Sequence, residues 1–186
     1  MASREQYTGG ELGGAQVIRT EGDKWTLILV RELRHSPDKV WQALTDPVQL
    51  REWAPFEADG SLDAVGKKVN LTWVGGPTRP QETTVTRADA PEILEYGDMR
   101  WELKLVGSGT RLTLWHKIDR RFIAMGAAGW HVCFDVLGRL LAGKHVGRVL
   151  GRDAIRSADW QRLHAEYARQ FGVATPGWPA KSAQES

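Results

Sequence analysis

Polar and apolar residues alternate through the middle of the chain, from about position 56 to position 118. Val69, Leu71 and Trp73 are separated by polar residues, and Gly-Gly-Pro at 75–77 ends this run. The alternation recurs over 100–105 and, after a glycine-containing turn, over 111–118. Positions 81–88 and 93–96 are further candidate strands, separated by a proline. This spacing predicts an antiparallel sheet with one buried face and one wet face.

The residues before this region predict one strand and two short helices. Positions 25–33 are rich in Leu, Ile and Val, as expected of a first strand. Ser36 supplies a helix N-cap and Pro37 a first helical residue, and Asp46 with Pro47 repeats the signal. We therefore expect two helices, beginning at positions 37 and 47.

The last third of the chain changes to a helical spacing. His131, Asp135 and Arg139 recur every four residues, and we expect them to form a polar stripe that faces solvent, with a surface pair between His131 and Asp135. A loop is predicted over 144–156, before a last helix that Ser157 caps and Gly172 ends. Between 122 and 143 the apolar residues form the opposite stripe of a long helix: Ala127, Trp130, Phe134, Leu137 and Leu141.

Together these elements predict an α+β domain in which a curved antiparallel sheet surrounds a long C-terminal helix. At 186 residues the chain has the length of one domain. We expect a flexible N-terminal arm over 1–22, the domain over 23–172 and a flexible tail over 173–186. The charges over 122–142 argue against a membrane span, because an Asp or Arg at the bilayer centre costs about 2.5–3.5 kcal/mol.

Composition narrows the partners and the location. The net charge of +2 is spread among acidic residues, unlike the clustered basic face of a nucleic-acid-binding protein. Cys133 is the only cysteine and the N-terminus lacks an apolar signal segment, so we expect a cytoplasmic protein. Positions 138–145 have the spacing of a phosphate loop, but His145 replaces its Ser or Thr. The histidines lack metal-ligand spacing, so we expect no metal and no cofactor.

Nine tryptophans are the unusual part of the composition. His116 occupies a buried register of its strand, either as a hydrogen-bonded core histidine or as a proton donor to a ligand. An inward-facing aromatic set around it could fill the core or line an apolar ligand pocket with His116 as the polar anchor. The aromatic residues expected there are Trp53, Phe56, Trp73, Trp101, Trp130 and Phe134.

Several motifs resemble, in order, those of the SRPBCC/START-like superfamily. Residues 31–53, with both Pro-containing helix starts, resemble the opening of the branch named for the activator of the heat-shock-protein-90 ATPase. The segments 109–116, 129–137 and 160–172 are similar to later motifs of that branch. The resemblance implies a helix-grip fold with a hydrophobic cavity between sheet and helix, and it implies no shared catalytic residue.

Three functions follow as hypotheses. The first is binding of a small lipophilic or aromatic ligand in the cavity. The second is a cyclase or dehydratase type of enzyme with His116 as acid or base, the weak catalytic candidate of the chain. The third is a co-chaperone-like interaction module, although we expect the segment before Trp25 to be too short for a chaperone-binding domain. Trp115, on the wet face of its strand, is a candidate contact in a homodimer.

Overall fold

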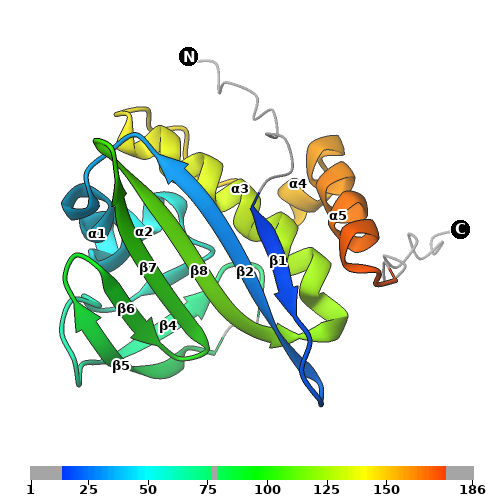
Figure 1. The fold of residues 1–186 in the computed structure, drawn as a ribbon, viewed down its shortest axis with the longest axis horizontal. Coiled ribbons are helices and arrows are strands. Elements are labelled where there is room, and N and C mark those ends of the chain that lie inside the picture. The colour runs from blue at the N-terminus through cyan, green and yellow to red at the C-terminus, as the bar shows by residue number, and fades with distance from the viewer. Residues whose placement is uncertain (1–13, 77–78, 175–186) are drawn as a thin grey trace, which may run out of the picture.

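A curved sheet and the long helix that crosses it dominate the structure, a computed structural model that describes residues 14–76 and 79–174 (Figure 1). The sheet has eight antiparallel strands in the order β1-β2-β8-β7-β6-β5-β4-β3. The strands are β1 Ala15–Ile18, β2 Lys24–Leu33, β3 Phe56–Ala58, β4 Lys68–Trp73, β5 Gln81–Asp89, β6 Ile93–Tyr96, β7 Met99–Val106 and β8 Gly109–Asp119. The helices are α1 Pro37–Thr45, α2 Pro47–Trp53, the 3-10 turn η1 Arg120–Phe122, α3 Ile123–Leu141, α4 Gly151–Arg156 and α5 Ala158–Phe171.

This arrangement confirms the expected α+β helix-grip fold. The two short helices follow the first long strand and lie at one end of the sheet (Figure 1). Their caps form as predicted, since the Ser36 side chain accepts a hydrogen bond from the Lys39 N–H and Asp46 accepts one from the Val48 N–H. The long helix α3 matches the helix expected between 122 and 143.

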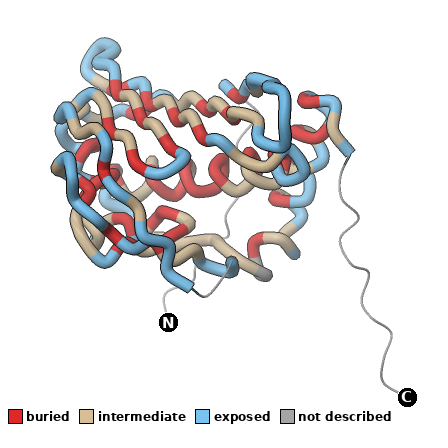
Figure 2. The backbone as a smooth tube through the Cα atoms, turned by 90° about the horizontal axis from the view of Figure 1, so that it is seen from below, coloured by how far each residue is buried: buried red, intermediate tan, exposed pale blue. Residues whose placement is uncertain are grey.

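The alternating strands bury one face against α3. In β2 and β8, the leucines at 27, 29, 112 and 114 are almost fully buried, and the residues between them are more exposed. Buried positions alternate with exposed ones along the strands in Figure 2, and α3 lies beside them. The main core therefore lies between the sheet and α3.

Residues 15–18 correct the prediction of a flexible arm over 1–22. They form β1, which pairs with β2 from Ala15–Leu29 to Ile18–Thr26. Gly14 adopts φ +65 and its carbonyl accepts a hydrogen bond from Val30. The Gln170 side chain donates to the Ala15 carbonyl and ties this edge strand to α5. The strand was not predicted because its four residues, next to glycines, are too few to show an alternating pattern. Positions 1–13 of the predicted arm and 175–186 of the predicted tail lie outside the described residues.

The prediction that His131, Asp135 and Arg139 form a solvent-facing stripe is wrong for its first two members. His131 is only 2% exposed, because α5 packs over this side of α3 (Figure 1). Its Nδ1 lies 2.8 Å from the Tyr167 hydroxyl. Asp135 forms an ion pair with Arg31 of β2, and its carboxylate lies 3.6 Å from His131 Nε2. The predicted pair therefore exists, but within a helix interface. No helix of the described residues is long and apolar enough to cross a membrane.

The predicted loop over 144–156 contains a short helix. Residues 144–150, which we call the strap, lead from α3 to α4. Arg148 in the strap forms an ion pair with Glu57 of β3, with Nη2 and Oε1 2.8 Å apart. The last helix begins and ends as expected, since the Ser157 side chain accepts from the Trp160 N–H and Gly172 adopts the left-handed conformation. The sequence does not predict α4 as a helix, because α4 has only six residues and glycines lie in and around the strap that precedes it.

Candidate ligand-binding cavity

A cavity of about 250 Å³, the apolar cavity, lies between α3, the sheet and the strap with α4. Trp73 comes from the end of β4, and His116 and Ile118 come from β8. The strap contributes Leu150 and α4 contributes Ile155. Among the described lining residues none is Asp, Glu, Lys or Arg, so His116 is the polar exception in an apolar wall.

Two glycines of α3 shape this cavity. A Cβ atom at Gly126 would lie 2.6 Å from Cδ1 of Ile118, so this glycine allows helix and strand to approach closely. A Cβ atom at Gly129 would meet no heavy atom within 4 Å, although Gly129 lines the cavity. A glycine inside a helix costs about 1 kcal/mol relative to alanine. The missing side chain at position 129 therefore leaves cavity volume at a cost in helix stability.

His116 is held in one orientation by two tryptophans. It is 9% exposed, and its Nδ1 accepts a hydrogen bond from Trp130 Nε1 over 3.0 Å. Its ring is parallel to the Trp73 ring within 3°, with centroids 6.1 Å apart. Because Nδ1 accepts, the neutral ring carries its proton on Nε2. His116 is thus a hydrogen-bond donor at the cavity wall.

Burial keeps this imidazole uncharged. Desolvation lowers the pKa of His116 to about 4, with Asp98 opposing the shift and Lys24 adding to it. Near pH 7 the ring can donate a hydrogen bond from Nε2, but it offers no positive charge to a ligand. Burial also raises the pKa of the Cys133 thiol to about 12, so this thiol stays protonated and unreactive near pH 7.

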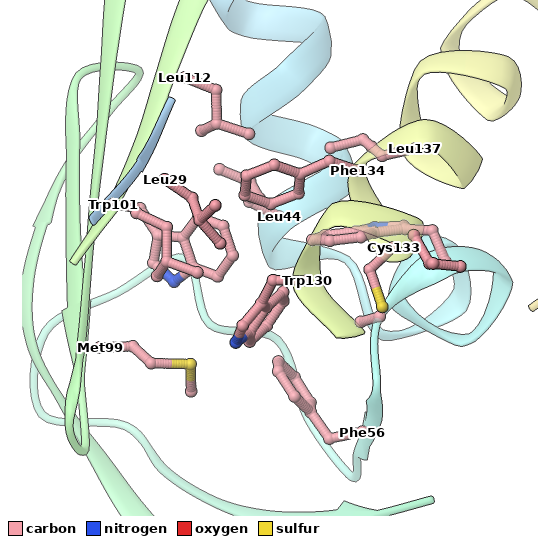
Figure 3. Packing of buried hydrophobic residues seen from close by; sticks show 14 of the residues in the cluster. Leu29, Leu44, Phe56, Met99, Trp101, Leu112, Trp130, Cys133, Phe134 and Leu137 are labelled. Atoms are coloured by element: carbon pink, nitrogen blue, oxygen red, sulfur yellow. The ribbon is translucent and has the colours of Figure 1, made fainter. Parts of the chain in front are cut away.

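The seven predicted site residues separate into two groups. Trp73, His116 and Trp130 line the apolar cavity. The other four, Trp53, Phe56, Trp101 and Phe134, are at most 1% exposed and pack into the core. Trp101 and Phe134 lie around Trp130 there (Figure 3). Trp130 belongs to both regions, because its ring contacts Trp101 edge-on with centroids 5.4 Å apart and the residue also lines the apolar cavity.

Several lining residues were missed from the sequence. Leu150 and Ile155 lie in the segment for which the sequence predicts a loop, and Trp160 lies in the last helix, for which the sequence predicts no cavity residue. Gly129 did carry a signal, since glycines at 126 and 129 interrupt an otherwise apolar helix. A glycine in a buried helix indicates either a close approach to a neighbouring element or an empty space. Here Gly126 lies at a close approach and Gly129 faces an empty space.

A second pocket of about 580 Å³, the polar pocket, adjoins the first. It shares Trp73 and His116 with the apolar cavity. Its remaining lining differs: Leu71 comes from β4, Met99 is the first residue of β7, and the other residues come from β5 and the β6–β7 turn. Gln81, Thr83 and Asp98 are among its polar groups. The parallel Trp73 and His116 rings therefore border both spaces.

Comparisons with solved structures place the chain in a known fold. CalU16 from Micromonospora echinospora is 21% identical with a TM-score of 0.59, and the match covers 86% of this chain and 92% of CalU16. The conserved protein of unknown function EF2215 from Enterococcus faecalis is 16% identical with a TM-score of 0.60, covering 84% and 89%. Protein MLL2253 from Mesorhizobium loti is 24% identical with a TM-score of 0.55, covering 63% and 97%. At these identities the likeness shows a shared fold.

A comparison with curated proteins finds no match. The family model described as activator of Hsp90 ATPase homolog 1-like protein matches residues 34–142, which is more than half of the chain. These residues run from the start of α1 through the end of α3, so they include the strands and the helix that form most of the apolar cavity. The chain therefore belongs to the family of activator of Hsp90 ATPase homolog 1-like proteins.

Proposed function

We propose that this protein binds a small lipophilic or aromatic molecule in the apolar cavity. The observation that carries the proposal is an apolar space at Gly129, where a helix residue without a side chain faces open volume. A void of this kind costs dispersion contacts and helix stability, and a bound apolar molecule would restore the contacts. Cavities lined by apolar groups with one polar group are typical of ligand sites.

The dimensions favour a compact ligand. The volume of about 250 Å³ lies just below the roughly 300–1,000 Å³ of common ligand pockets. Trp73 and Trp130 offer aromatic faces and edges, to which a flat ring system can stack or pack edge-on. A molecule of two or three fused rings matches this wall better than a long acyl chain.

Titration of the purified protein with the uncharged probe N-phenyl-1-naphthylamine tests the proposal. Binding is expected to raise the probe's emission and to quench tryptophan emission. Gly129→Leu places a side chain in the cavity and should abolish both changes. Gly138→Leu is the matched control, because Gly138 lies in the same helix away from the cavity lining.

Circular dichroism should show that both glycine variants fold. Failure of the wild-type protein to bind this probe, naphthalene or any other small apolar ring compound would overturn the proposal. Equal binding by the Gly129→Leu variant would also overturn it, because the bound molecule would then lie elsewhere.

The enzyme hypothesis has weaker support. A cyclase or dehydratase needs a group that exchanges protons near neutral pH, whereas the pKa of His116 is about 4. Among the described residues that line the apolar cavity, no carboxylate, lysine or cysteine supplies a second acid or base. His116 Nε2 could polarise a ligand carbonyl by hydrogen bonding, and this is a binding role as much as a catalytic one.

The co-chaperone, homodimer and cytoplasmic assignments stay predictions. For the dimer, Trp115 is half-buried on the outer face of β8, and the Arg100 guanidinium lies 5.8 Å from its ring centroid. This cation–π contact already covers one face of the indole, which weakens the case for Trp115 as a subunit contact. Stimulation of a chaperone ATPase by the purified protein would test the co-chaperone hypothesis.

A further inference from the structure

The polar pocket and the apolar cavity meet at two aromatic rings. Trp73 is oriented by its Nε1, which donates to Gln81 Oε1 over 3.3 Å, and His116 is oriented by Trp130. Both rings contribute to the lining of both spaces. A molecule that contacts these rings from the apolar cavity therefore lies next to the polar pocket.

The polar pocket offers neutral hydrogen-bonding groups. The Thr83 hydroxyl has no hydrogen-bond partner among the residues that the structure describes. Gly97, at φ +55, brings the β6–β7 turn so close that a Cβ atom there would lie 3.2 Å from Thr83 Oγ1. The Gln81 amide nitrogen and the His116 Nε2–H are further donors at the same pocket.

Charge at this site disfavours an anion. Glu82 and Asp98 line the polar pocket, and each already pairs with an exposed lysine: Lys68 at 3.3 Å and Lys24 at 2.6 Å. No lysine or arginine is among the described residues that line either space. Because the His116 ring is neutral near pH 7, a ligand carboxylate or phosphate would lose water without gaining a cation.

We propose that one ligand occupies both spaces: a neutral molecule with an apolar ring body in the apolar cavity and a hydroxyl or carbonyl group in the polar pocket. The inference rests on the proposed function and adds the chemical class of the ligand. The body packs against Trp130 and Gly129, and the oxygen-bearing end passes the Trp73–His116 pair to reach Thr83.

Four probes with one ring system test this assignment at pH 7.5. They are 2-butylnaphthalene, 4-(2-naphthyl)butan-1-ol, 4-(2-naphthyl)butanoate and 4-(2-naphthyl)butylamine, each titrated into the full chain by calorimetry. The alcohol is expected to bind about five- to ten-fold more tightly than butylnaphthalene, as one net hydrogen bond allows. The carboxylate should bind at least about ten-fold more weakly than the alcohol.

Two variants on β5 locate the polar end. Thr83→Val keeps the shape of the side chain and removes its hydroxyl, so it should bring the affinity for the alcohol close to that for butylnaphthalene. Thr84→Val is the matched control, since Thr84 is the next residue of β5 and is exposed outside the pocket.

The outcomes separate the two proposals. If butylnaphthalene binds but the alcohol binds no better, or if the carboxylate or the amine binds most tightly, the neutral two-part ligand is wrong and apolar binding stands. An alcohol preference unchanged in Thr83→Val would also overturn the inference. If none of the four probes binds, the proposed function fails with it.

Discussion

The indole Nε1 of Trp130 donates a hydrogen bond to Nδ1 of His116, and this bond links α3 to β8 at the wall of the apolar cavity. It leaves the proton of the neutral imidazole on Nε2. The same two rings form an edge-on contact with centroids 5.9 Å apart. One side-chain pair thus joins helix to sheet and determines which hydrogen-bonding group the site presents.

The stability of the protein should fall as the pH falls from about 6.5 to about 4. The ordinary pKa of histidine is 6.5, and burial lowers that of His116 to about 4. Between these values the unfolded chain binds a proton at this position and the folded chain does not, so acid favours unfolding. The loss of unfolding free energy should approach about 3 kcal/mol. Urea denaturation at pH 7, 6, 5 and 4.5 measures it.

His116→Gln should flatten this pH dependence. The amide cannot titrate, so the difference in unfolding free energy between wild type and variant should shrink as the pH falls. Burial also lowers the pKa of His131, which adds a slope of the same sign in both proteins and cancels in the difference. Parallel curves for the two proteins would show that His116 does not carry the effect.

Replacement by phenylalanine should lower mainly the unfolding free energy at Trp53 and mainly the probe affinity at Trp73. Trp53 Nε1 donates to the Ala43 carbonyl, which has no helical partner because Pro47 lacks an N–H. Trp53→Phe leaves this buried carbonyl unpaired and opens a void, so we expect a loss of about 2–4 kcal/mol in unfolding free energy. Its affinity for N-phenyl-1-naphthylamine should not change.

Trp73→Phe is the reciprocal case. Trp73 is partly exposed at the end of β4 and borders both spaces, so its replacement should cost less than about 1 kcal/mol in stability. Probe affinity should fall severalfold, because ring area at the cavity wall is lost. Titration and urea denaturation of both variants give the comparison. A loss of affinity in Trp53→Phe alone would place the bound probe in the core.

The sequence predicted the fold and three of the residues that line the apolar cavity, Trp73, His116 and Trp130. Alternation identified which face of β4 and β8 is buried, and so it placed Trp73 and His116 inward. Alternation does not give the position of a residue along the groove between sheet and helix. Trp101 and Trp73 have the same inward register, yet one fills the core and the other borders the cavity. The strap and α4 line part of the cavity, and the six residues of α4 have no strong helical pattern, so the sequence does not show where along the groove the empty space lies.

The environment of α3 was the other feature that local pattern could not provide. An amphipathic helix is ordinarily assigned one buried and one solvated side. Here α5 covers the second side, and the polar residues of that side make their bonds within the interface, such as His131 with Tyr167. Only the packing of a third layer reveals this.

Tyr167→Phe should weaken the contact between α3 and α5. The Tyr167 hydroxyl lies 2.8 Å from His131 Nδ1 in a buried setting, so its removal leaves the imidazole nitrogen without this partner. We expect a loss of about 1–2 kcal/mol in unfolding free energy. A double-mutant cycle with His131→Leu should give a coupling energy of about 1 kcal/mol. Additive effects would mean that the hydroxyl and the imidazole do not interact.

Glu57→Gln should speed the release of a bound ligand. The Arg148–Glu57 ion pair fastens the strap to β3, and the strap carries Val149 and Leu150 at the cavity. Gly147 and Gly151, with φ of 74° and 69°, flank residues 148–150 and give the backbone freedom to open there. A partly exposed ion pair contributes about 0.2–1 kcal/mol, so dissociation should quicken by up to about five-fold. Stopped-flow release of N-phenyl-1-naphthylamine measures the rate.

The control for this variant is Glu32→Gln, which breaks the ion pair of Glu32 with Arg111 away from the apolar cavity. Both variants remove one exposed carboxylate and should change unfolding free energy by less than about 1 kcal/mol. Acid should imitate Glu57→Gln, because the hydrogen bond from Arg148 lowers the pKa of Glu57 and protonation below that pKa ends the ion pair. If release is equally fast in wild type and in both variants, ligand exchange does not require opening of the strap at Glu57.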